Sequence, residues 1–251
     1  MGSITVSLIV LACVFGGALL GIFLRTCLPE NHLGADSKDI VKLGMGLVGT
    51  MAALVLGLLV ASAKGSYDAQ SAELTQLSAN IALLDRALAL YGPETKEQRA
   101  ILRGAITRML DQFWPKDGSS VSSGTPTAAR GEILYEKIQG LSPKNDLQRS
   151  LQGQALSIAV DIGKTRYLMF AQQASSVSMP LLVVLVLWLT VIFISFGLFA
   201  PFNATVLSSL FVSALSVSGA VFLILEMYAP YSGLIQLSNA PLRAALAQLG
   251  Q

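Results

Sequence analysis

The stretch GTMAALVLGLLVASAKG, residues 49–65, combines two patterns on one segment. Every fourth position is small: Gly49, Ala53, Gly57, Ala61 and Gly65. Leu and Val fill most positions between them, and the apolar run 43–63 is long enough to cross the ~30 Å hydrocarbon core of a bilayer, which takes about 20 residues. Burying Leu does not draw helices together in lipid, whereas small residues four apart let two backbones approach closely. The stretch therefore predicts a membrane-spanning helix with one bare face.

Three more apolar runs are long enough to span, at residues 4–24, 181–200 and 204–225. Backbone groups inside hydrocarbon must bond within their own segment, so each run is predicted to be a helix. The run at 4–24 is longer than the apolar part of a signal peptide and follows no basic residue, so we expect a retained span. These features, with a mean hydropathy of +0.62, predict an all-α membrane protein with four transmembrane helices.

The charged residues are concentrated between the second and third spans. Residues 64–178 hold 13 of the 17 Lys and Arg and 11 of the 15 Asp and Glu. Both signs are interspersed there, which is unlike the basic face that nucleic acid requires. We therefore expect an extramembrane helical bundle at 64–178, inserted between a first hairpin (1–63) and a second hairpin (179–227).

Helical periodicity organises the start of this bundle. A seam at spacings of three and four runs through Leu74, Leu77, Ile81, Leu84, Leu88 and Tyr91. Only Gly65 interrupts the path from the second span, so one long helix is expected to carry the seam. Thr95 and Gln98 have the spacing of a capping box at the start of the next helix, whose apolar face is Leu102, Ile106, Met109 and Phe113. Residues 116–125 read as a polar loop, and Thr125-Pro126 as the start of a short helix.

Two features are expected in the second hairpin and beyond it. Pro201-Phe202-Asn203 is a short joint between the last two spans, and Asn203 suits the N-cap of the fourth. In the segment 228–251, Pro230 and Gly233 break the helix, and Pro241 begins a short amphipathic one. That final helix is predicted to lie at the membrane interface.

The small-residue face of the second span has two interpretations. Close packing within or between subunits is one; the lining of a narrow pore is the other, with Thr50 as its polar side chain. A second stripe on the fourth span includes Ser209, Ser213 and Ser216. Its hydroxyls either bond the carbonyl one turn back or form a hydrophilic lining.

Charges near the spans bear on orientation. Glu226 ends the fourth span and is expected to be exposed at the headgroups; if buried, it needs a cation such as Lys64 or Arg166. With the N-terminus inside, these two cations are cytoplasmic; the opposite orientation would put Arg25 and two nearby lysines inside. We favour the first arrangement, with both termini and the bundle in the cytoplasm.

No catalytic motif, metal-ligand set or cofactor motif occurs in the sequence, so an enzyme is not expected. His32 is the single histidine and has no neighbouring ligands. Cys13 and Cys27 form neither a CxxC pair nor a disulfide framework.

Three stretches together resemble a known family. They are DSKDIVKLGMGLVGTMAALVLGLLVASAKGSYD (36–68), LLDRALALYGPE (83–94), and the segment 196–246, in which FGLFAPFNATV leads to EMYAPYSGLIQLSNAPLRAAL. This pattern is similar to the bacterial bestrophin-like membrane proteins, a family whose domain has no assigned function. The match covers most of the chain and keeps the order of its parts.

The resemblance implies a helical cytosolic region between the second and third spans and a pore lined by the second span, as in the pentameric chloride channels called bestrophins. It also implies a homo-oligomer in the bacterial inner membrane and chloride or another small anion as the conducted species. The second span here has no Phe, unlike the aromatic neck of bestrophins, and no acidic calcium-binding cluster is evident.

Two functions from different classes follow. The first is an oligomeric, anion-conducting channel. The second is a non-conducting membrane scaffold or sensor whose helical bundle binds a protein partner, favoured by the heptad seam and by the lack of charge at any candidate pore. A proton-driven motor ranks third because it would need a carboxylate inside the membrane, and only Glu226 comes near to that.

Overall fold

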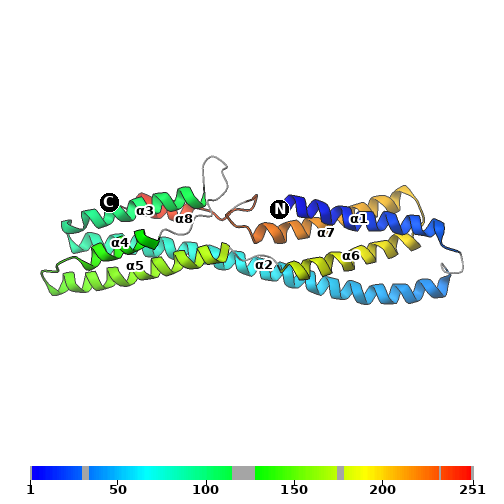
Figure 1. Ribbon diagram of the computed structural model, residues 1–251, viewed down its shortest axis with the longest axis horizontal. Helices are drawn as coiled ribbons and strands as arrows, with labels where there is room; N and C mark the ends of the chain where they lie inside the picture. Colours follow the sequence, from blue (N-terminus) through cyan, green and yellow to red (C-terminus); the bar gives the residue numbers. More distant parts are fainter. Residues whose placement is uncertain (1, 30–33, 115–127, 174–177, 232, 250–251) are drawn as a thin grey trace. The chain divides into compact units, whose positions relative to one another are not determined.

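The computed structural model describes residues 2–29, 34–114, 128–173, 178–231 and 233–249. Within these ranges the regular structure is helical and no strand occurs. The helices long and apolar enough to cross a membrane are α1 (Ser3–Cys27), α2 (Ala35–Tyr91), α6 (Met179–Phe199) and α7 (Ala204–Met227) (Figure 1). The predicted all-α fold with four apolar spans is confirmed.

The chain divides into two compact units, which are described separately. The first unit comprises Met1–Ser66 and Ser176–Tyr228, and the second comprises Tyr67–Ser175 and Ala229–Gln251. The helix α2 contributes residues to both units, because it continues through Gly65 without interruption, as predicted. A lone glycine costs a helix only about 1 kcal/mol relative to alanine, which is too little to end it.

In the first unit, α1 packs against both α6 and α7. Its buried face carries Val10, Val14 and Ala18, none of which is more than 2% exposed. Phe15 of α1 meets Phe211 of α7 edge to face, with ring centroids 5.2 Å apart. The N-terminal helix is thus the element on which the last two spans are assembled.

In the second unit, the C-terminal part of α2 packs with α3 (Lys96–Phe113), α4 (Ala128–Gln139), α5 (Asp146–Gln173) and α8 (Ala240–Gln248). All six residues of the predicted heptad seam are buried, and none is more than 4% exposed. The predicted apolar face of α3 is buried as well. The seam therefore belongs to a core that the chain builds from its own helices.

One predicted helix cap is confirmed and the other is wrong. Asn203 caps α7, with its Oδ1 accepting from the Val206 amide at 2.8 Å. The capping box does not form: the Thr95 hydroxyl reaches back to the Leu88 and Gly92 carbonyls at 2.6 and 2.8 Å, and Gln98 Nε2 donates to the Lys137 carbonyl at 3.0 Å. A helix end leaves carbonyls without partners. The tight turn Pro93–Thr95 brings the Thr95 hydroxyl back to carbonyl groups at the end of α2, where it supplies a donor.

The C-terminal segment also departs from prediction. The apolar side chains of α8 that we assigned to the membrane interface, Leu242 and Ala245, are buried in the core of the second unit. The indole N–H of Trp114 donates to the Leu237 carbonyl at 2.9 Å, which ties this segment to the end of α3. The amphipathic pattern was identified correctly, but its apolar face meets protein rather than lipid.

Two predictions fall outside the described ranges. The polar loop at 116–125 lies there entirely, and so do Thr125 and Pro126, although α4 begins at Ala128. His32 also lies outside them.

Candidate functional site

The small-residue stripe of α2 lies on a face that the rest of the chain leaves open. Ala53, Gly57 and Ala61 are exposed, and a Cβ added at Gly57 would meet no atom within 4 Å. Gly49, at the edge of the stripe, would contact only the Cδ1 of Ile192, at 4.0 Å. Packing inside one chain therefore does not explain the stripe. Packing between subunits and pore lining both stay predictions.

The opposite face of α2 packs into the first unit through Ala52, Leu59 and Ala63, each at most 4% exposed. Even so, only 11% of the most apolar 18-residue window of α2 is buried, against 33% for α1, 33% for α6 and 28% for α7. Of the four candidate spans, α2 therefore has the largest share of its surface available to lipid, to a second copy or to a pore.

The close backbone approach that we expected at α2 is found between α1 and α6. A Cβ on Gly21 would lie 2.0 Å from the Ile194 carbonyl oxygen, and one on Gly197 would lie 2.1 Å from the Ala18 carbonyl oxygen. Only glycine fits at these two positions. The sequence carries a signal for this approach in Gly17-x-x-x-Gly21, the spacing that permits close helix packing in lipid, although we did not predict a contact there.

Hydroxyl groups on the candidate faces bond to their own helices. Thr50 donates to the Gly46 carbonyl at 2.9 Å, and Ser216 donates to the Val212 carbonyl at 2.9 Å. Ser209, Ser213 and Ser216 are all exposed. For Thr50 and Ser216 the hydroxyl proton is used one turn back, which leaves the oxygen lone pairs facing outward.

A hydroxyl that sequence reasoning passed over joins two helices. Ser218 is 5% exposed and donates to the Ser7 carbonyl at 2.6 Å, linking α7 to α1. Ser7 in turn donates to the Ser3 carbonyl at 2.8 Å. Hydrogen bonds between helices at an apolar depth stabilise association by about 0.6 kcal/mol on average.

The expectation for Glu226 was wrong: it is buried, with 3% of its surface exposed. Glu226 is the second-last residue of α7, two residues before the C-cap Tyr228, and belongs to the buried face of that helix. Lys64 is exposed in the same unit, whereas Arg166 belongs to the second unit and is half-buried. A buried carboxylate requires compensating partners, and the burial of Glu226 places this requirement inside the first unit.

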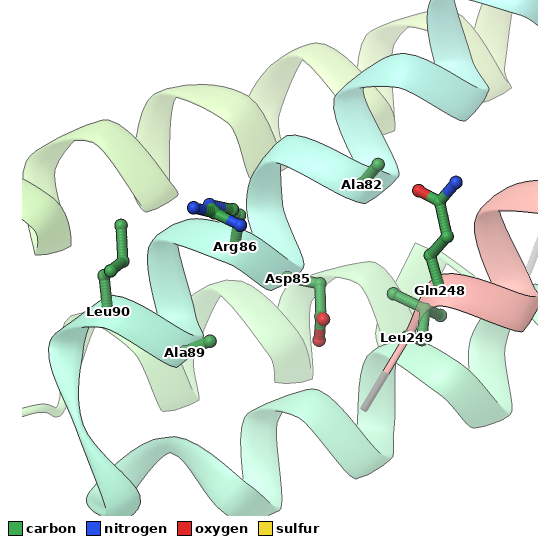
Figure 2. Close-up of a pocket in the computed structure, with 7 residues that line it drawn as sticks. All are labelled: Ala82, Asp85, Arg86, Ala89, Leu90, Gln248 and Leu249. Atoms are coloured by element: carbon green, nitrogen blue, oxygen red, sulfur yellow. The ribbon is translucent and has the colours of Figure 1, made fainter. Parts of the chain in front are cut away.

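The second unit contains an open groove of about 500 Å³ (Figure 2). One wall is the α2 surface around Asp85 and Arg86, and the other is formed by Gln248 and Leu249 at the end of α8. The Asp85 carboxylate accepts two hydrogen bonds from Arg99, at 2.7 and 2.8 Å. These bonds raise the pKa of Arg99 because they favour its charged form. The pair fastens α3 to α2.

Some exposed charges elsewhere in this unit also form ion pairs. Lys144 Nζ lies 2.8 Å from Glu94 Oε1. This hydrogen bond lowers the pKa of Glu94 and raises that of Lys144. Among the residues that the structure describes, no three His, Cys, Asp or Glu side chains gather into a candidate metal site.

The chain matches the family model described as the Bestrophin-like domain over residues 12–242, nearly its whole length. The chain belongs to the bestrophin-like family. No curated protein and no solved structure matches it. Together with its four apolar helices, the membership makes it a membrane protein.

Within this bestrophin-like chain, the family-like segment after α7 has a visible structural role. Tyr231 is 5% exposed and packs against Phe113 and Trp114, with ring centroids 5.0 and 5.6 Å away. Burial raises the pKa of its phenol. The Pro-Tyr motif thus anchors the C-terminal segment to α3.

Proposed function

We propose that the protein is a homo-oligomeric membrane channel for small anions, in which the exposed face of α2 lines the pore. Family membership supports a channel-like membrane protein. The observation that carries the proposal further is the exposure of α2: its apolar window is the least buried of the four candidate spans, and its small residues point away from the chain's own core.

The chemistry of that face suits a narrow, weakly polar path. Gly57 and Ala61 present backbone with little side chain, so copies of α2 can surround an axis closely. Thr50 supplies an oxygen on the same exposed side, and no Asp or Glu occurs between residues 43 and 63. A ring of carboxylates would favour cations, so the absence of acids in this segment of sequence favours anions.

Conduction is tested by fusing the purified full-length protein into planar bilayers under a chloride gradient. The proposal expects a current whose reversal potential follows chloride when the gradient is changed. A well-folded oligomer that stays silent, or whose reversal potential follows sodium, would refute anion conduction. Bilayers that receive protein-free detergent are the control.

Assembly through α2 is tested separately with Gly57→Leu. The single chain has room for this side chain, so its helical content should not change, whereas the subunit number measured by native mass spectrometry should fall. Gly219→Leu is the matched control, because Gly219 is an equally open position on α7. An unchanged oligomer in both variants would place the α2 stripe against lipid.

The alternative is a non-conducting scaffold or sensor whose helical bundle at 64–178 binds a protein partner. The heptad seam of that bundle is buried against the chain's own helices, so a partner would bind another surface of the bundle. Crosslinking in cells through residues 64–178 should then capture one dominant heterologous partner, and recovery of self-crosslinks alone would count against this function.

A further inference from the structure

A second feature of α2 points to a ligand. An open cleft of about 550 Å³, here called the α2–α6 slot, lies in the first unit between these two helices. Its walls are mostly apolar. The residues that form them include Val41, Met45, Gly46, Gly49, Ile192 and Phe196. The volume falls within the ~300–1,000 Å³ of small-molecule sites.

Glycine keeps this slot open. A Cβ at Gly46 would meet no atom within 4 Å, and a Cβ at Gly49 would meet only Ile192 Cδ1. Phe196, on the opposite wall, is 51% exposed, so the slot opens to the surroundings of the spans. Hydrocarbon surrounds a membrane span, and an apolar cleft open to it is filled by hydrocarbon rather than by water.

Two lysines line the same slot. Lys38 and Lys42 are four residues apart on α2, one helical turn, so their ammonium groups lie at the same end of the cleft. Lys42 also lies 3.9 Å from Asp39, but these side chains are 62% and 75% exposed. An ion pair between side chains that are so exposed contributes little free energy, so Lys42 can still bind another anion. Asp39 itself does not line the slot.

Apolar walls with a cationic end match one class of molecule. We propose that the α2–α6 slot binds an anionic phospholipid, with an acyl chain between α2 and α6 and the headgroup phosphate against Lys38 and Lys42. Lysines near the end of a span reach the headgroup level, where each attracts anionic lipid. The inference does not depend on conduction, because the slot lies on the α6 side of α2 and shares only Gly49 with the small-residue stripe, whose members Ala53, Gly57 and Ala61 are exposed.

The test uses the full chain in mild detergent, titrated in native mass spectrometry with phosphatidylglycerol and, separately, with phosphatidylcholine carrying the same acyl chains. A lysine close to anionic lipid contributes about 1 kcal/mol of binding free energy, which is about fivefold in affinity. Replacing both lysines, in Lys38→Ala/Lys42→Ala, should therefore raise the dissociation constant of the first bound phosphatidylglycerol molecule by about 25-fold. Phosphatidylcholine binding should change little. The control Lys96→Ala/Lys164→Ala removes the same charge from exposed positions in the second unit.

The apolar half of the site is tested with Gly46→Leu, which fills the slot without a backbone clash and should weaken both lipids. Gly44→Leu is its control, since Gly44 is exposed two residues away and does not line the slot. Circular dichroism confirms that each variant folds.

Three results would overturn the proposal. Equal loss of phosphatidylglycerol from both lysine pairs would mean that net charge alone attracts the lipid. Equal effects of Gly46→Leu and Gly44→Leu would mean that the slot holds no acyl chain. A change in subunit number with Gly46→Leu, with lipid binding unaltered, would mean that a second copy occupies the slot.

Discussion

The contact between α1 and α6 makes a sharp prediction about stability. Gly21→Ala adds a single methyl group where its Cβ would lie 2.0 Å from the Ile194 carbonyl oxygen and 2.9 Å from the Leu198 amide nitrogen. Both neighbours are backbone atoms of a helix, so neither can rotate away as the end of a side chain could. The helices must move apart by more than 1 Å, because ordinary van der Waals contact with a Cβ begins near 3.4 Å.

The magnitude follows from what that separation removes. A gap of 0.5–1 Å forfeits about a quarter to a half of the dispersion energy between facing atoms, and the α1–α6 interface is well packed, with Val14 and Leu185 fully buried. Overpacking of this kind typically costs about 1–3 kcal/mol. Because rigid backbone meets the new methyl group, we expect Gly21→Ala to lower the free energy of unfolding by about 3 kcal/mol, at the upper end of that range.

The assay is equilibrium unfolding of the full-length protein in mixed micelles with increasing dodecyl sulfate, followed by circular dichroism. Gly16→Ala is the control on the same helix, because its Cβ would meet no atom within 4 Å. It should change stability by no more than about 0.5 kcal/mol. If Gly21→Ala and Gly16→Ala unfold at the same proportion of dodecyl sulfate, the backbones of α1 and α6 are not in contact and the prediction is refuted.

Three further predictions concern polar contacts. Asp85→Asn leaves Arg99 with a weakened partner in a half-buried position and should lower the free energy of unfolding by about 2 kcal/mol, measured by thermal melting; an unchanged melt would show that the pair is not maintained. Asn203→Ala removes the cap of α7 and should cost about 1 kcal/mol, while Asn203→Asp, which keeps the acceptor, should cost less; equal losses would contradict the cap. Because the pKa of Glu94 is lowered from 4.5 in the folded chain, its contact with Lys144 stabilises at pH values above 4.5 and loses that effect as the pH falls through the lowered pKa. Lys144→Gln should therefore reduce the loss of stability on acidification, and identical pH profiles of the variant and the parent would refute this.

Sequence periodicity predicted the helices well because the relevant physics is local. The four spans follow from the length and polarity of each run, and the seam from Leu74 to Tyr91 is buried as its spacing required. The Asn203 cap was also readable, because a side chain that accepts from an amide three residues away needs no distant partner.

Pairings between helices were not readable in the same way. The stripe at Gly57 and the motif at Gly17 and Gly21 are both small-residue patterns, but only the second meets another helix within the chain. Nothing in the spacing says which one has a partner, because the partner, Gly197, stands alone in α6. Glu226 was misjudged for a related reason: its burial depends on which side of α7 the other helices occupy.

The C-terminal helix shows a third limit. An amphipathic pattern predicts that one face of a helix is buried, but it does not say whether that face packs against lipid or against protein. The apolar face of α8 packs into the core of the second unit, and the contacts that decide it come from Trp114, far away in sequence.

The position of the pore is tested most directly by thiol modification under voltage clamp. In a background with Cys13→Ser and Cys27→Ser, both of which replace exposed native thiols, Gly57→Cys is treated with an anionic methanethiosulfonate while the chloride current is recorded. Modification should reduce the current, because the attached sulfonate narrows the path and repels anions, while Gly219→Cys on α7 should not respond. A current that is unaffected at Gly57→Cys, or reduced equally at both positions, would contradict a pore lined by α2.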